Sequence, residues 1–265
     1  MKKFRFSRSQ LCLPYAVFLA LFVIAPLVVI LYYAFTNGEG NFTFNNFAGF
    51  FASTNTLGTL LYSFALAIVT TLVCLVIAYP TAYILARSNI KKKYVLLMLF
   101  VLPMWINFTL RITALKEILS LIEGNISMYP FLNSVIGMTY DFLPFMILPL
   151  YTSLLKLDKS LLEAASDLGA NKFAVFLKVT LPLSVPGIIS GMTMVLLPSM
   201  TNYVVLDMLY NSTYIMGSLI GSYFSAYDWN NGSMISLVLL VIIFIVTLVT
   251  NRFSDKDSDG RGALL

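Results

Sequence analysis

Long apolar runs separated by short polar stretches dominate the chain. Four of them, residues 9–38, 40–86, 179–206 and 229–251, contain no Asp, Glu, Lys or Arg. A helix that crosses the hydrocarbon core of a bilayer needs about 20 consecutive, mainly apolar residues. Each run is long enough to supply such a helix, so the pattern predicts an all-α, polytopic membrane protein.

With two further apolar segments in the middle of the chain, the pattern predicts six transmembrane helices. No linker rich in Gly or Ser interrupts them, so we expect one transmembrane domain over residues 1–265. The first apolar run is about 25 residues long and lacks the small-residue cleavage site of a signal peptide, so we expect a retained helix. The expected helices are Leu11–Phe35, Leu57–Ala86, Tyr94–Leu115, Phe131–Leu155, Pro186–Val205 and Gly232–Thr250.

The composition agrees with this interpretation, since 59% of the residues are hydrophobic and 11% are charged. An average globular domain has about 45–50% apolar and 25% charged residues. The formal net charge of +5 does not indicate a nucleic-acid partner, because the basic residues lie beside the apolar runs. We therefore expect membrane lipid, and no nucleic acid, around the chain.

The basic residues also predict the orientation. Of 17 Lys and Arg residues, 15 lie in the N-terminal segment, the 87–93 turn, the 156–185 loop and the C-terminal tail, and only Arg111 and Lys116 lie on the other side. Lys and Arg accumulate in cytoplasmic loops. Both termini and the 156–185 loop are therefore expected to be cytoplasmic.

The longest cytoplasmic loop contains a pattern for two short helices. Ser160 followed by Glu163 fits a capping box, which begins a helix. Gly169 ends that helix by adopting positive φ, Asn171 caps a second helix, and Leu181-Pro182 closes it. On the residues alone, this unit either docks a partner protein or lies against lipid headgroups.

The loop also carries a family resemblance. Glu163-Ala164-Ala165, then Gly169, then Val179-Thr180-Leu181-Pro182 is similar to the pattern EAA, three residues, G, nine residues, I-x-L-P, with Val in place of Ile. This pattern is typical of permease subunits in ATP-driven, binding-protein-dependent (ABC) importers, where the loop is the coupling helix that docks in the ATPase. The resemblance implies the type I, MetI-like permease fold. It also implies ATPase-coupling roles for Glu163, Ala164, Ala165, Gly169, Leu181 and Pro182.

Three further segments, 149–170, 182–191 and 102–116, resemble the spermidine/putrescine branch of this family. That resemblance implies a polyamine importer in a bacterial inner or plasma membrane. Its expected partners are a second, homologous permease, a cytoplasmic ATPase dimer and an extracytoplasmic polyamine-binding protein. The alternatives are an importer of the same architecture for iron, sulfate, phosphonate or thiamine, or an ion-driven secondary transporter.

Ionisable residues within spans are candidates for the substrate pathway, because charges in the membrane are costly and are usually functional. Asp141 lies near the middle of the Phe131–Leu155 helix and either hydrogen-bonds a neighbouring helix or meets a substrate ammonium group. Arg111 and Asp207 lie near the outer ends of their helices, where they are expected to anchor at the interface or to pair with each other.

Aromatic and acidic residues on the outer side complete the candidates. Trp105 lies on the helix of Arg111, and Tyr203 ends the Pro186–Val205 helix. The segment 206–231 contains Asp207, Asp228, four Tyr and Trp229 but no Lys or Arg, which favours cations. The spacing of Gly187 and Gly191 allows close helix contact, either within the subunit or with a partner permease.

The chemistry that is absent limits the function. The sequence has no G-x-x-x-x-G-K-[ST] loop and no His, so no catalytic site or metal site suggests itself. We expect a transport subunit rather than an enzyme, with no cofactor in this chain and with ATP and Mg used by the partner ATPase.

Overall fold

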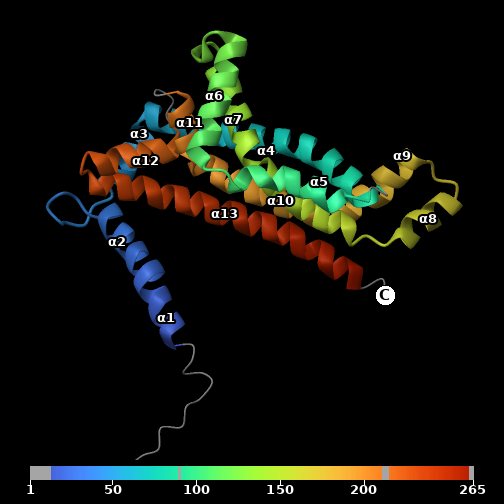
Figure 1. Ribbon diagram of the computed structural model, residues 1–265. Helices are drawn as coiled ribbons and strands as arrows, with labels where there is room; N and C mark the ends of the chain where they lie inside the picture. The colour runs from blue at the N-terminus through green and yellow to red at the C-terminus, as the bar shows by residue number, and fades with distance from the viewer. Residues whose placement is uncertain (1–12, 89–90, 211–214, 263–265) are drawn as a thin grey trace, which may run out of the picture. The chain divides into compact units, whose positions relative to one another are not determined.

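The computed structural model describes residues 13–88, 91–210 and 215–262, and most of these residues are helical (Figure 1). No strand occurs among them, and extended pairing is limited to an isolated bridge between Thr36 and Phe42. The predicted all-α class is confirmed. By proximity of its residues the chain divides into two compact units.

The first unit combines the N-terminal region with residues Leu219–Ile242. A continuous helix, Pro14–Ala34, consists of α1 (Leu13–Leu19), a π-helical turn (Ala20–Ile24) and α2 (Ala25–Ala34). It is followed by α3 (Asn45–Ala52); most of α12 (Met216–Ser225) and the first half of α13 (Trp229–Gly262) complete the unit. The Asn230 amide donates to the backbone oxygens of Tyr33 (3.1 Å) and Thr36 (2.6 Å), which joins the end of α2 to the start of α13.

The second unit, Gly58–Ser218 and Ile243–Leu265, contains the candidate sites. Its helices follow in order: α4 (Thr54–Arg87), α5 (Lys93–Val101) with a 3-10 turn (Leu102–Trp105), α6 (Phe108–Glu123), a second 3-10 turn (Ile126–Met128), α7 (Pro130–Leu155), α8 (Lys159–Asp167), α9 (Lys172–Val175) with a π-helical turn (Phe176–Thr180), α10 (Leu181–Thr201) and α11 (Tyr203–Leu209).

Helix α7 is the central helix of this unit. In the most apolar 18-residue stretch of α7, 61% of the residues are buried, compared with 33% in α4 and 17% in Lys172–Thr201. The apolar surface that is not buried is left for lipid. Helix α10 packs along α7 through Gly187 and Gly191, where a Cβ would overlap Ser153 and Met146 respectively. The close glycine contact therefore lies within the subunit, one of the two arrangements that the spacing allowed.

Among the described residues, five helices are long and apolar enough to cross a membrane. Their bounds agree with five of the six predicted spans to within several residues, except that the helix Lys172–Thr201 starts earlier than predicted. The sixth prediction, a single helix over Tyr94–Leu115, is wrong. The segments Lys93–Trp105 and Phe108–Glu123 meet at 99° (Figure 1). Pro103 lies in the 3-10 turn and Asn107 caps the new helix, so the regular backbone bonding ends between them.

The span predicted to begin at Pro186 begins much earlier. The helix is continuous from Lys172 to Thr201, so the predicted closure at Leu181-Pro182 is wrong. The Leu181 amide donates to the Phe176 oxygen five residues back, in π-helical register. Pro182 follows directly, so its missing N–H falls at the junction of the π-helical turn and α10, where the regular α-helical register is already shifted. The non-helical part of the 156–185 loop is correspondingly short.

Candidate functional site

Helix α8 begins with a side-chain cap. Asp158 Oδ1 accepts a hydrogen bond from the Ser160 amide (3.0 Å), and this bond lowers the pKa of the Asp158 carboxyl. The predicted cap, Ser160, lies inside the helix instead. The capping-box interpretation was wrong because Asp158, two residues earlier, satisfies the free amide first.

Helix α8 ends as predicted, at a glycine with positive φ. Gly169 has φ 83°, its amide donates to Ser166 O (2.9 Å), and the Ala170 amide donates to Ala165 O (3.1 Å). These two bonds form a Schellman motif, which only a residue without a Cβ enters at no steric cost. Asn171 then caps α9 by accepting from the Ala174 amide (2.8 Å), also as predicted.

The loop is anchored at one end and exposed at the other. Phe176 packs edge-on against Tyr79 and Tyr83 of α4, with ring centroids 5.8 and 5.6 Å apart. By contrast, Leu168 is 90% exposed and Phe173 is 70% exposed. Figure 1 shows α8 and α9 projecting beyond the end of α7. Two large apolar side chains are thus exposed on a loop that is anchored to α4, which is typical of a surface that a partner protein or lipid covers.

The residues singled out by the family pattern differ in accessibility. Glu163 and Ala164 are exposed on α8, and Ala165 is half-buried. Leu181 packs against the buried core, and exposed Pro182 lies beside it at the start of α10. Glu163 and Ala164 are therefore available to a partner, whereas Leu181 anchors the end of the loop to the core.

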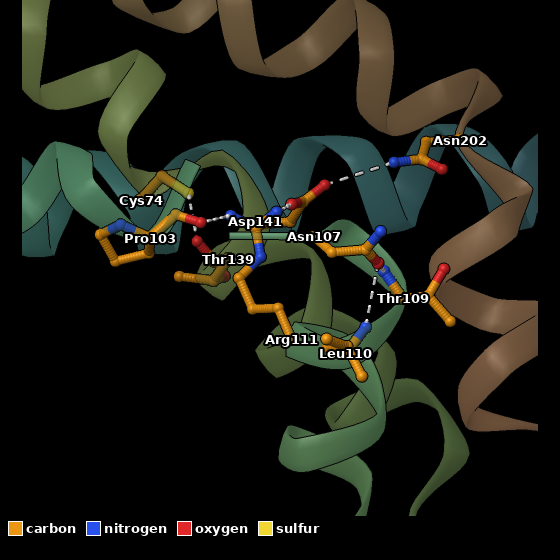
Figure 2. Close-up of polar contacts among 9 residues, drawn as sticks. All are labelled: Cys74, Pro103, Asn107, Thr109, Leu110, Arg111, Thr139, Asp141 and Asn202. Atoms are coloured by element: carbon orange, nitrogen blue, oxygen red, sulfur yellow. Dashed lines mark hydrogen bonds and ion pairs between the residues drawn. The ribbon is translucent and has the colours of Figure 1, made fainter. Parts of the chain in front are cut away.

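A second site lies among α5, α6, α7 and α11. Arg111 donates from Nη2 to Asp141 Oδ1 and from Nη1 to the Pro103 oxygen (2.9 Å), as Figure 2 shows. Both charged side chains are buried, and the guanidinium lies 5.8 Å from the Phe108 ring centroid and 5.6 Å from that of Tyr140. Arg111 therefore fills a cage of carboxylate, carbonyl and aromatic faces, which is how proteins hold a desolvated cation.

Two helix breaks meet at this ion pair. Asn107 caps α6 at the first break, accepting from the Thr109 (3.0 Å) and Leu110 (3.4 Å) amides. Asn202 lies between α10 and α11 at the second, accepts from the Val204 amide (3.2 Å) and donates to Asp141 Oδ2 (3.4 Å). A cavity of about 480 Å³ opens here, lined by Arg111, Asp141, Asn202 and mainly apolar side chains. Helix breaks that bring a few charged and polar groups to a cavity are typical of transporter substrate sites.

The structure corrects the predictions for Arg111. The Arg111 side chain neither extends to the interface nor pairs with Asp207. Asp207 lies on the exposed face of α11 and has no ion-pair partner among the described residues. The reason is the bend at residues 106–107, which places Arg111 in the first turn of α6 beside α7 rather than at the end of a straight helix. Asp141 is hydrogen-bonded between helices, as one of its two readings proposed.

Other predicted residues are not among those that line this cavity. Trp105 is 85% exposed, Tyr203 is 40% exposed, and neither lines it. Asp228 belongs to the first unit, where it caps α13 by accepting from the Asn231 amide (3.1 Å) and side chain (2.8 Å). Of the aromatic group in 206–231, Tyr210 belongs to the second unit, Tyr223, Tyr227 and Trp229 belong to the first, and Tyr214 is outside the described residues.

Sequence reasoning missed Asn202 and the Pro103 carbonyl. Asn202 had a usable signal, because Asn is a preferred helix cap and follows a long apolar helix. The carbonyl had none, since any residue carries one and only the bend leaves it free for Arg111.

Comparison with known proteins identifies the family. Residues 78–256 match the family described as "Binding-protein-dependent transport system inner membrane component". The chain is 38% identical to the spermidine/putrescine transport system permease protein PotB of Escherichia coli (strain K12), over 74% of this chain and 77% of that protein. It is also 38% identical to PotB of Haemophilus influenzae (strain ATCC 51907 / DSM 11121 / KW20 / Rd), over 88% and 89%.

Solved structures agree on the fold. A chain in the crystal structure of the bacterial alginate ABC transporter in complex with alginate pentasaccharide-bound periplasmic protein aligns with a TM-score of 0.74 at 15% identity, covering 94% of this chain and 93% of that one. A chain of the inward-facing MetNI methionine ABC transporter aligns with a TM-score of 0.60 at 16% identity, covering 77% and 99%. The protein therefore has the fold of ABC importer permeases, and the chain belongs to the family of binding-protein-dependent transport system inner membrane components.

Proposed function

We propose that the chain is one of two permease subunits in an ATP-driven importer of polyamines. The observation that carries the substrate class is the 38% identity, over most of both chains, to permeases named for spermidine and putrescine transport. The partners would be a second permease, a cytoplasmic ATPase pair and an extracytoplasmic binding protein. Both termini would lie in the cytoplasm, as the distribution of basic residues predicts.

The exposed face of α8 would dock in the ATPase. Glu163 and Ala164 are exposed there, the Schellman motif at Gly169 sets the direction in which the chain leaves, and Leu168 and Phe173 supply apolar contact area. Phe176 packs against Tyr79 and Tyr83 of α4, and Leu181 is the first residue of α10, so a displacement of α8 would be transmitted to both helices. Nucleotide binding can shift the permease only if the ATPase contacts α8 differently in two states.

The cavity beside Asp141 would form part of the cation pathway. Asp141 already holds one cation, the Arg111 guanidinium, next to aromatic faces. A primary ammonium group presents the same charge to the same acceptors, so it would compete with Arg111 for the carboxylate. When substrate passes, this exchange would break the ion pair between Arg111 and Asp141, which connects the two helix breaks.

Uptake of labelled spermidine by proteoliposomes tests the proposed function. With the complete complex and ATP, we expect uptake that unlabelled spermidine or putrescine reduces, whereas ferric ion, sulfate, phosphonate and thiamine leave it unchanged. Competition by one of those solutes would reassign the substrate class. Uptake by the isolated chain that follows an ion gradient and ignores ATP would support a secondary transporter instead.

Two matched pairs of variants test the docking role of α8. Glu163→Ala should lower ATP-driven uptake and ATPase co-purification by about fivefold or more, because an interface contact of this kind is worth at least about 1 kcal/mol. Glu117→Ala removes an equally exposed carboxylate from α6 and should change neither. Gly169→Ala and Gly124→Ala strain similar backbones, with φ 83° and 69°, but only the first should uncouple transport. Equal effects within either pair would contradict the assignment.

A further inference from the structure

A basic cavity lies where α4 ends and the segment leading to α8 begins. It has a volume of about 530 Å³, within the range of about 300–1,000 Å³ that is usual for ligand sites. Its polar lining consists of Arg87, Ser88, Lys93, Lys156, Asp158 and Lys159. Four basic side chains face one carboxylate, which is already engaged in capping α8. The cavity therefore has a surplus of positive charge.

Three buried side-chain atoms of two lining residues, Arg87 and Ser88, have no protein partner among the described residues. Nε and Nη2 of Arg87 and Oγ of Ser88 are buried, and within the described part of the chain none of these atoms has a hydrogen-bond partner. Buried polar groups in proteins are hydrogen-bonded as a rule, and a charged donor is the most costly to leave unpaired. Because Arg87 and Ser88 both line the cavity, their unpaired donors favour an acceptor supplied from outside the chain.

The position and chemistry favour a phosphate group. The cavity lies at the end of the α4 apolar span, in the turn whose basic residues predict the cytoplasmic face. A planar guanidinium with flanking ammonium groups matches the oxygens of a phosphate, and basic pockets between transmembrane helices at this face bind lipid headgroups. The basic residues alone would be explained by orientation, but a concave site with buried, unpaired donors is not.

We propose that this cavity binds the phosphate of an anionic phospholipid headgroup. Arg87 and Ser88 bind the phosphate oxygens, and Lys93, Lys156 and Lys159 neutralise its charge. Because Asp158 and Lys159 also begin α8, the bound headgroup joins the end of α4 to the start of the helix proposed to couple to the ATPase. This makes the docking loop responsive to the lipid composition of the membrane.

The test measures lipid binding directly and does not depend on transport. The purified full-length chain in a neutral detergent is titrated with phosphatidylglycerol, phosphatidylcholine or inorganic phosphate, and binding is followed by native mass spectrometry and thermal shift. Wild type should bind phosphatidylglycerol more tightly than phosphatidylcholine. Arg87→Gln should weaken phosphatidylglycerol binding by about fivefold or more, in line with the contribution of one basic residue near a membrane surface.

Lys91→Gln is the matched control, since Lys91 is exposed in the same turn, carries the same charge and does not line the cavity. Its binding should equal that of wild type. Should Arg87→Gln fail to fold, the exposed pair Lys156→Gln/Lys159→Gln replaces it. Equal losses for Arg87→Gln and Lys91→Gln, or no preference for phosphatidylglycerol, would overturn the proposal. If dilute inorganic phosphate displaces the lipid, and if this displacement requires Arg87, the cavity is still a phosphate site, but its ligand is free phosphate rather than a lipid headgroup.

Discussion

The side chain of Arg111 shows how a single residue can organise a membrane-embedded site. Its two terminal nitrogens bind groups from different helices, the Asp141 carboxylate of α7 and the Pro103 carbonyl freed by the bend. A buried ion pair is costly to form but very costly to break from one side, because the remaining charge is left uncompensated. The pair therefore holds the bend against α7 for as long as both partners are present.

Single and double replacements of Arg111 and Asp141 distinguish a structural role of the ion pair from a role in transport. Asp141→Asn leaves the Arg111 charge unpaired and should destabilise the protein by about 3–5 kcal/mol, measured by thermal unfolding in detergent. The double variant Arg111→Gln/Asp141→Asn should regain most of that stability. If Asp141 also meets the substrate, the folded double variant should still import spermidine poorly. Wild-type uptake by the double variant would restrict Asp141 to a structural role.

The contact between α7 and α10 depends on small residues at two positions. A Cβ on Gly187 would overlap the Ser153 side chain and lie 3.1 Å from the Pro149 oxygen. The backbone cannot move away cheaply, because the adjoining α7 residues Leu150, Tyr151 and Leu154 are buried in the core. Close approach of helices through glycine is how helix pairs gain contact without a hydrophobic driving force in lipid.

Gly187→Ala should therefore lower stability by about 1–3 kcal/mol, the usual cost of overpacking. Gly221→Ala, in α12, meets no atom within 4 Å and should be neutral or slightly stabilising, since Ala favours helix. Thermal unfolding of the two purified variants gives the comparison. Adding Ser153→Gly to Gly187→Ala should restore part of the loss. No difference between the two alanine variants would show that α7 and α10 are further apart than described.

The orientation of the chain follows from charge, and it decides which sites meet which partners. If both termini are cytoplasmic, as the basic residues predict, α8 and the basic cavity near Arg87 lie on the side of the proposed ATPase, and Ile126–Met128 lies on the opposite side of the membrane. The reverse orientation would place α8 outside the cell and remove the basis for coupling. The orientation is therefore the proposition on which the docking role depends.

Cysteine labelling tests it. In a chain whose Cys12 and Cys74 are replaced by Ser, single cysteines are placed at Ser127 or Ser166, both exposed. In intact cells or spheroplasts, a membrane-impermeant maleimide should label Ser127→Cys directly and Ser166→Cys only after permeabilisation. Labelling of Ser166→Cys in intact spheroplasts would show that α8 lies outside the cell and would contradict the predicted topology.

Features that depend on neighbouring residues could be predicted without a structure. Spans follow from the length of an apolar run, and the end of α8 follows from Gly169, because both are local properties of the chain. The proposed docking residues could be singled out for a similar reason, since their pattern lies within one short segment. The cap of α8 was misplaced by two residues because Asp158 and Ser160 are both good caps, and their sequence does not rank them.

Features that depend on distant residues required the tertiary structure. Arg111 was expected to anchor at the interface or to pair with Asp207, but the bend at residues 106–107 places it beside Asp141, which is 30 positions away. The cavity near Arg87 likewise joins the ends of two helices that are about 70 residues apart in the chain. The run of hydrophobic residues specified that the protein crosses a membrane, because burial in lipid depends on local polarity. Which charges meet inside it was decided by helix packing, because that depends on bends and contacts that no single segment encodes.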